Sequence, residues 1–186
     1  MMTNDNNIMT YDTNWLIAQQ PTPKFCFFWK PEISEDGSIT ESCLGQWWVA
    51  PFTVNGKTYL TAEHWMMAGK ATLFGDTEIE KKILASPSPA TVKALGRKVA
   101  NFDPAKWDAA KREIVRQGNI YKFTQHPELK AFLLSTGKDV LVEASPLDRI
   151  WGIGLSATNE NAAHPEKWRG QNLLGYALME VRDVLK

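Results

Sequence analysis

Two charged side chains, Glu63 and Lys70, occur within a segment of the sequence that is otherwise largely apolar. Thr61 offers an N-cap for a helix that we expect to end near Phe74. Met67 would share one face of this helix with both charges, and the other faces carry mostly apolar residues that predict burial. A carboxylate and an ammonium in such surroundings must be paired, neutralised or turned towards a wet cavity.

The spacing of Glu63 and Lys70 leaves room for a ligand between them. Along a helix this separation corresponds to about 10.5 Å, because each residue adds about 1.5 Å. Helical salt bridges use three- or four-residue spacing, so the two charges are too far apart to pair with each other. The alternative is that each charge bonds another part of the fold or lies near a surface.

A second candidate region covers residues 143–154, EASPLDRIWGIG, which follow an expected strand and enter a long irregular stretch. Asp148 could act on water or bind sugar hydroxyls, and Trp151 could stack on a base. Gly152 would let a ligand approach the backbone closely. The alternative is a turn in which Trp151 is a packed anchor. The glycines do not form a dinucleotide-binding fingerprint, because no third glycine follows at the required spacing.

Three further residues are candidates for substrate contacts. Arg97 could bind a phosphate with two hydrogen bonds, or it could form a surface ion pair. Asn172 could hydrogen-bond a base edge or a ribose, or it could cap the last helix. Trp48 belongs to an aromatic stretch, residues 44–52, that forms either a stacking wall or part of the core.

The elements that must position these residues can be read from turn and capping signals. Asn55-Gly56 between two β-prone runs predicts a hairpin over residues 51–60. Capping residues and prolines predict further helices, and β-rich runs predict two strands. The expected helices cover residues 76–85, 104–123, 127–136 and 171–185, and a further helix is expected to start at Ser88-Pro89. The expected strands cover residues 25–29 and 139–144. We therefore expect a single compact α+β domain over residues 23–186, predominantly helical with a small hairpin or sheet, after a flexible polar segment at 1–22.

Composition limits the classes of function. Lys plus Arg equals Asp plus Glu at 21 each, which argues against binding nucleic acid by bulk charge but leaves a local basic groove open. Eight Trp and eight Phe suit either a core of large rings or a pocket for planar ligands. The two cysteines have no metal-type spacing, and no apolar run approaches a membrane span, so we expect a cytoplasmic protein without a metal.

Several motifs occur together and in order between residues 25 and 185. They are PFTVNGKTY at 51–59, AEHWMMAGKA at 62–71, ALGR at 94–97, NFD at 101–103, KF at 122–123, EASP at 143–146, DRIWGIGL at 148–155 and WRGQNLLG at 168–175. As a set they resemble the NADAR (YbiA-like) family. The sequence departs from that family at residues 44–48, where many members have a Phe-Ser-Asn-Phe or Phe-Ser-Gln-Trp type segment.

The resemblance implies a YbiA-like fold and hydrolysis of a bond between ribose and the nitrogen of an amine-bearing base, without a cofactor. One activity associated with the family removes ADP-ribose from the amino group of guanine in nucleic acid, often beside an ADP-ribosyltransferase toxin. The other cleaves phosphoribosylated pyrimidine intermediates of riboflavin biosynthesis. The positions that match the family's polar active site are Glu63, Lys70, Asp148 and Trp151.

Two mechanisms fit these residues. A buried Lys70 with a lowered pKa could add to C1 of the ribose as a Schiff base, while Glu63 or Asp148 moves protons. In the competing scheme a carboxylate activates water and Lys70 only holds hydroxyls. A third reading, from another functional class, is a non-catalytic module that binds ADP-ribose or nucleotides.

Overall fold

The computed structural model describes residues 11–186, in which long helices alternate with two small pairs of strands. The elements are α1 (Thr13–Ile17), β1 (Phe25–Phe28), η1 (Glu41–Leu44), β2 (Phe52–Val54), β3 (Lys57–Tyr59), α2 (Ala62–Leu73), α3 (Thr77–Ala85), α4 (Pro89–Gly96), α5 (Pro104–Gln125), α6 (Pro127–Ser135), β4 (Val140–Glu143), η2 (Pro165–Lys167) and α7 (Leu173–Leu185). This inventory confirms the predicted helix-dominated α+β domain.

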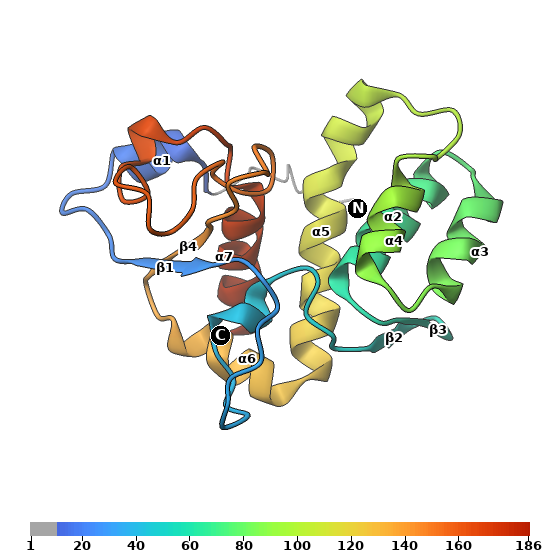
Figure 1. Cartoon of the computed structure of the whole chain (residues 1–186), viewed down its shortest axis with the longest axis horizontal. Helices are drawn as coiled ribbons and strands as arrows, with labels where there is room; N and C mark the ends of the chain where they lie inside the picture. Colours follow the sequence, from blue (N-terminus) through green and yellow to red (C-terminus); the bar gives the residue numbers. More distant parts are fainter. Residues whose placement is uncertain (1–10) are drawn as a thin grey trace, which may run out of the picture.

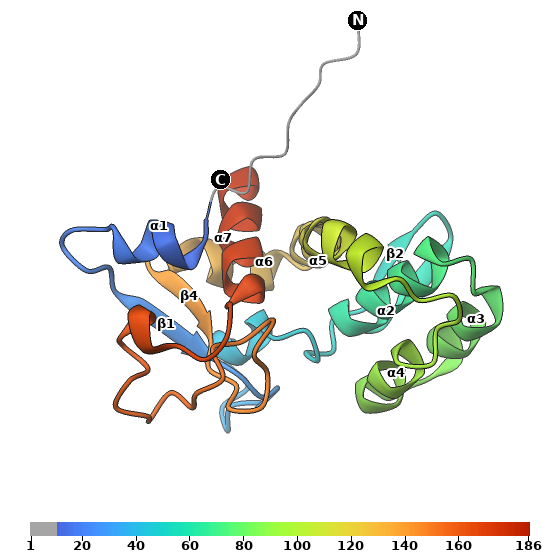
Figure 2. The same ribbon diagram turned by 90° about the horizontal axis from the view of Figure 1, so that it is seen from above.

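The long helix α5 runs through the middle of the molecule and separates two groups of elements (Figures 1 and 2). Helices α2, α3 and α4 and the hairpin β2–β3 lie on one side of α5. Helix α7, the strands β1 and β4, and helix α1 lie on the other. Helix α5 packs against both α2 and α7, so it fixes the two groups relative to each other.

Helices α2, α3, α4 and α5 begin where the sequence places capping side chains. The hydroxyl of Thr61 accepts a hydrogen bond from the backbone N–H of His64. Helix α2 ends at Leu73, with Phe74 as its C-cap, close to the expected end. The other predicted N-caps also accept backbone hydrogen bonds, namely Asp76, Ser88 and Asp103. Each cap satisfies an N–H group that lacks a partner within the helix.

The predicted hairpin is confirmed. Asn55 and Gly56 have φ angles of 50° and 79°, which the two positions of a type I′ turn require. Phe52 pairs with Tyr59 across the strands, and their rings stack at a centroid distance of 5.7 Å. The hairpin therefore delivers the chain to Thr61 and the start of α2 in a fixed direction.

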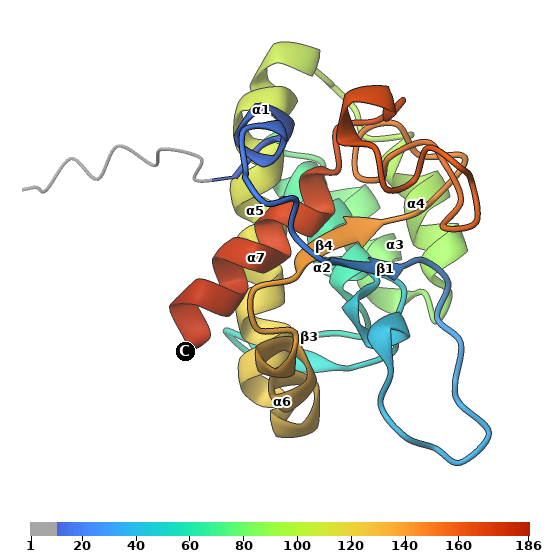
Figure 3. The same cartoon turned by 90° about the vertical axis from the view of Figure 1, so that its left-hand side faces the viewer.

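Strands β1 and β4 form a parallel pair in which Phe25 is opposite Val140 and Phe28 is opposite Glu143. Val140, Leu141 and Val142 are fully buried, because β1 lies along one edge of β4 and α7 packs against it (Figure 3). Glu143 is the last residue of β4, and the long loop over residues 144–172 follows it directly.

The polar segment expected to be flexible, residues 1–22, divides into two parts. Residues 1–10 lie outside the described residues. From Tyr11 onward the segment packs on the body of the protein: Leu16 of α1 is buried, and the hydroxyls of Thr13 and Tyr176 are 2.9 Å apart. Over residues 11–186 no helix combines the length and the apolar character that a membrane crossing requires.

Candidate active site

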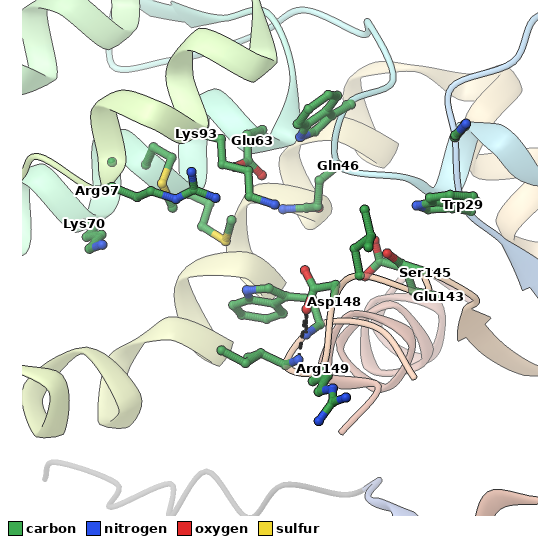
Figure 4. Close-up of a pocket in the computed structure, with 18 of the residues that line it drawn as sticks. Trp29, Gln46, Glu63, Lys70, Lys93, Arg97, Glu143, Ser145, Asp148 and Arg149 are labelled. Atoms are coloured by element: carbon green, nitrogen blue, oxygen red, sulfur yellow. Dashed lines mark hydrogen bonds between the residues drawn. The ribbon is translucent and has the colours of Figure 1, made fainter. Parts of the chain in front are cut away.

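A pocket of about 700 Å³ lies where the two groups of elements meet. Its walls come from α2 and α4 on one side and from residues 143–151 on the other, with the segments around Trp29 and Gln46 closing one end (Figure 4). The volume lies within the range of small-molecule sites. Glu63, Lys70 and Asp148 all line it, so the structure brings together the three residues predicted to be catalytic.

Glu63 stands in the first turn of α2 and is 4% exposed. Its pKa is raised to about 7, mainly by burial and also by the charge of Asp148, while Lys93 and Arg97 act in the opposite direction. Its backbone N–H donates to the carbonyl of Gln46 over 3.0 Å, which ties α2 to the neighbouring pocket wall. A carboxyl with such a pKa can both take up and release a proton near neutral pH.

Asp148 has one carboxylate oxygen already engaged. Its Oδ1 accepts hydrogen bonds from the backbone N–H groups of Ile150 and Trp151, over 2.9 and 2.8 Å. These bonds hold the turn over residues 148–151 in place (Figure 4). Asp148 therefore has a clear structural role in addition to its position on the pocket wall.

Lys70 lies two turns along α2 from Glu63, as the helical spacing predicted. Its Nζ is 4.5 Å from the ring centroid of Phe102 and 5.6 Å from that of Trp107. Partial burial lowers the pKa of the Lys70 ammonium, and the nearby charge of Arg97 lowers it further. Both effects increase the fraction of neutral, nucleophilic amine.

Four other cations surround the carboxyls, and they come from separate parts of the chain. Lys93 projects from α4, Arg97 directly follows that helix, and Arg149 belongs to the turn that carries Asp148 (Figure 4). Lys30 follows β1. The predicted phosphate ligand Arg97 is thus on the pocket wall. The pocket thus holds carboxyl groups with lysine and arginine side chains around them, and these cations suit an anionic ligand.

Tryptophan rings supply much of the apolar lining. They are Trp29, Trp47, Trp107 and Trp151. Trp151, the candidate for stacking on a base, is one of these lining residues. Trp48 is not among the lining residues; it packs against the core, and its neighbour Trp47 faces the pocket instead.

The comparisons with known proteins agree with this architecture. Residues 27–186 match the model of the NADAR domain. The chain belongs to the NADAR domain family. N-glycosidase R617 of Acanthamoeba polyphaga mimivirus is 43% identical to it over 167 residues, which cover 87% of this chain and 96% of that protein. N-glycosidase YbiA of Escherichia coli (strain K12) is 36% identical over 135 residues, which cover 73% of this chain and 76% of that protein.

The NMR structure of the E. coli protein YbiA superposes on this NADAR domain with a TM-score of 0.67. The two chains are 29% identical, and the match covers 88% of this chain and 85% of the other. The predicted YbiA-like fold is therefore confirmed. Family and relatives together place this chain among the hydrolases that act on N-glycosyl bonds.

Two residues predicted to bind substrate have other roles in this NADAR domain. Gly152 is buried behind the pocket, and a Cβ there would lie 2.8 Å from the carbonyl oxygen of Glu143. Its lack of a side chain lets the loop pack directly on the end of β4. Asn172 is fully buried with φ at 51°, and its amide bonds the backbone of Glu143 and Leu141 rather than capping α7. Neither placement supports the predicted substrate contact.

Glu143 belongs to the candidate region 143–154 but was given no role from the sequence; its side chain lines the pocket from the end of β4. Its Oε2 is sealed from solvent and has no hydrogen-bond partner within residues 11–186. Its pKa is raised to about 8, mainly by burial and also by the charges of Asp148 and Glu63, while Lys93 acts in the opposite direction. The sequence signal that could have identified Glu143 is its place directly after three apolar strand residues, because this predicts a charged group at the edge of the core.

Gln46 was missed as well. Its Oε1 accepts a hydrogen bond from the amide of Asn119 over 2.9 Å, and the residue lines the pocket. Its Nε2 is buried and has no hydrogen-bond partner among residues 11–186. The segment before it is anchored by Lys122, whose ammonium donates to the carbonyls of Cys43 and Gly45 over 2.6 and 3.0 Å. A fully buried lysine thus holds the pocket wall that carries Gln46.

Proposed function

We propose that this NADAR domain removes ADP-ribose from the amino group of guanine in nucleic acid by hydrolysing the bond between ribose C1 and that nitrogen. The observation that carries the proposal is the charge pattern of the pocket. Glu63, Glu143 and Asp148 are available to act at the glycosidic bond, and five cations surround them. A ribosyl group that bears phosphates would satisfy both sets of charges.

The distribution of the cations supports a diphosphate over a single phosphate. Lys70 is on α2, Lys93 is on α4 with Arg97 directly after it, Lys30 follows β1, and Arg149 is on the opposite loop. A single phosphate would be held by one local cluster of donors. Cations spread over four segments suit a longer anion whose charges lie apart, as in ADP-ribose.

The mouth of the pocket suits a base that remains attached to a nucleic-acid strand. Leu147, Ile150 and Trp29 line the pocket, yet they are 88%, 44% and 37% exposed. Exposed apolar and aromatic side chains of this kind provide stacking surfaces for unpaired bases. The zero net charge of the chain disfavours binding to intact duplex by charge alone, so we expect a single-stranded or unpaired target.

The lining residues provide what the reaction needs. The departing nitrogen requires a proton and the sugar passes through an oxocarbenium-like state, which nearby carboxylates stabilise. Lys70, with its lowered pKa, is placed on the same helix to add to C1 or to hold the sugar hydroxyls. Such a substrate also implies a partner enzyme, an ADP-ribosyltransferase that attaches the group this domain removes.

The direct test is to incubate the full chain with a single-stranded oligonucleotide that carries one ADP-ribosylated guanine. We expect free ADP-ribose and an oligonucleotide with intact guanine, both seen by mass spectrometry. A 5-phosphoribosylamino-pyrimidine serves as the comparison substrate. A higher kcat/KM on the pyrimidine would contradict the proposed substrate but not the reaction class. Tight binding with both ligands recovered intact would indicate a non-catalytic module instead.

A further inference from the structure

We propose that Glu143 is a second catalytic carboxyl of this site, which holds a proton in the resting enzyme and gives it to the departing nitrogen while Glu63 carries the negative charge. The inference rests on the proposed N-glycosidase function and deepens it by assigning the acid. It follows from the position of the two carboxyls on opposite walls of one pocket and from their unequal surroundings (Figure 4).

The backbone of Glu143 is held in place from two sides. Its N–H donates to Oδ1 of Asn172 over 3.0 Å, and its carbonyl accepts from the N–H of Ile153 over 3.0 Å. Pairing of β4 with β1 fixes the strand itself, with Phe28 opposite Glu143. A side chain on such a support can hold a proton at a defined point in the pocket.

The carboxyl of Glu143 lacks the contacts that an ionised group in this position would need. Oε2 is out of reach of solvent and accepts no hydrogen bond from any described residue. A buried carboxylate oxygen without a partner costs several kcal/mol, and protonation removes this cost. A protonated carboxyl also offers a donor, which a ligand nitrogen can accept.

The surroundings of Glu63 favour the opposite charge state. It stands in the first turn of α2, where the helix dipole stabilises an anion. Lys93 and Arg97 lower the pKa of Glu63 while Asp148 raises it. At Glu143, Lys93 lowers the pKa, and both Asp148 and Glu63 raise it. When two close carboxyls share one proton, it stays on the one with the poorer support for charge.

Asp148 is a weaker candidate for the proton donor. Its Oδ1 already accepts two backbone N–H groups and holds the turn at residues 148–151. It contributes instead by its charge, which raises the pKa of Glu143.

The step balances as follows. The bond between C1 and nitrogen breaks, its electron pair stays on the nitrogen, and the proton of Glu143 moves to that nitrogen. A water oxygen forms the new bond to C1, and the proton that this water loses goes to Glu63. If Lys70 has first added to C1, the attack of water breaks the bond between C1 and the Lys70 nitrogen. Transfer of this proton from Glu63 back to Glu143 restores the resting state.

The kinetic test compares Glu143→Gln with Glu143→Asp and with the exposed loop control Glu160→Gln. Gln keeps the shape of the side chain but has no transferable proton, so we expect kcat to fall about 100-fold or more. Asp retains part of the activity, and the control retains all of it. Wild-type activity should fall at alkaline pH as Glu143 ionises, and Glu143→Gln should lose this alkaline limb.

Full turnover of Glu143→Gln would overturn the proposal, and so would an alkaline limb that survives in its residual activity. Circular dichroism and thermal unfolding show whether the variant is folded. If the wild-type protein hydrolyses neither the ADP-ribosylated oligonucleotide nor the 5-phosphoribosylamino-pyrimidine, the proposed reaction itself fails, and the catalytic role of Glu143 fails with it.

A second measurement is independent of turnover. Protein labelled with ¹³C at the glutamate carboxyl is titrated by NMR without ligand. We expect one resonance that titrates near pH 8 and is absent in Glu143→Gln. A Glu143 signal that is fully ionised at pH 6 would overturn the assignment even if the enzyme is active.

Discussion

The side-chain oxygen of Asn172 accepts a hydrogen bond from the backbone N–H of Glu143 over 3.0 Å. Its Nδ2 donates to the carbonyl of Leu141, also over 3.0 Å. The side-chain amide of Asn172 thus bonds two backbone groups of β4, the N–H of Glu143 and the carbonyl of Leu141. In a wider sheet a further strand would bond them. A residue at the start of α7 therefore fixes the backbone that carries a pocket carboxyl.

We expect Asn172→Ala to lower the free energy of unfolding by about 3 kcal/mol, because two buried backbone groups lose their partners and a left-handed residue gains strain. Urea denaturation measures the change. Asn101→Ala is the matched control, since Asn101 has a φ of 57° and is exposed; there we expect a loss of about 1 kcal/mol. Equal losses in both variants would mean that the hydrogen bonds to β4 contribute nothing.

Lys70 allows the two mechanisms to be separated. We expect Lys70→Ala to lower kcat about 100-fold or more if its amine adds to C1 or positions the sugar. Lys70→Arg keeps the charge but cannot act as a nucleophile. Arg should therefore be as inactive as Ala if an imine forms, and should recover part of the activity if Lys70 only holds hydroxyls.

Borohydride reduction during turnover provides the direct readout for Lys70. A covalent adduct on this residue, located by peptide mass spectrometry, would demonstrate the imine. Lys82→Ala, on the exposed surface of α3, is the control and should behave as wild type in both assays. Full turnover of Lys70→Ala would exclude both roles.

Arg97 should affect binding and the pH profile together. Its loss removes a candidate phosphate ligand, so we expect Arg97→Ala to raise KM about 10-fold or more and to weaken the dependence of KM on salt. The charge of Arg97 now lowers the pKa of both Glu63 and Lys70, so its removal should shift both upward. Lys98→Ala changes the next residue, which does not line the pocket, and should leave KM and the pH profile unchanged.

Stability should decrease as the pH rises through the neutral range. The pKa values of Glu63 and Glu143 are about 7 and about 8 in the folded protein, against an ordinary 4.5. A raised folded-state pKa means that the folded state binds the proton more tightly. The resulting stability is fully present below pH 4.5 and is lost as the pH rises through about 7 and 8.

Urea denaturation at pH 5 and pH 8.5 checks this dependence, with a lower midpoint expected at the higher pH. Glu143→Gln should reduce the difference between the two midpoints, because Gln cannot ionise. Glu160→Gln, in an exposed part of the loop, should leave the difference unchanged. A midpoint that rises with pH in the wild type would contradict raised pKa values for these carboxyls.

The sequence alone determined the local elements of this protein and one side of its pocket. Helix starts at capping residues and the hairpin at Asn55-Gly56 depend on neighbouring residues, so they could be predicted. The shared helix face of Glu63 and Lys70 follows from helical periodicity in the same way. Arg97, Asp148 and Trp151, which the sequence offered as candidates, also line the pocket.

Only the tertiary structure decided which residues meet those of α2. Glu143 reaches the pocket because β4 pairs with β1 and α7 packs beside it, contacts between segments far apart in the chain. Trp47 lines the pocket while Trp48 packs against the core, and the path of the loop between core and pocket decides which ring takes which place. Asn172 serves the edge of β4 instead of a ligand for the same reason. Such choices depend on long-range packing, which local spacing in the sequence does not encode.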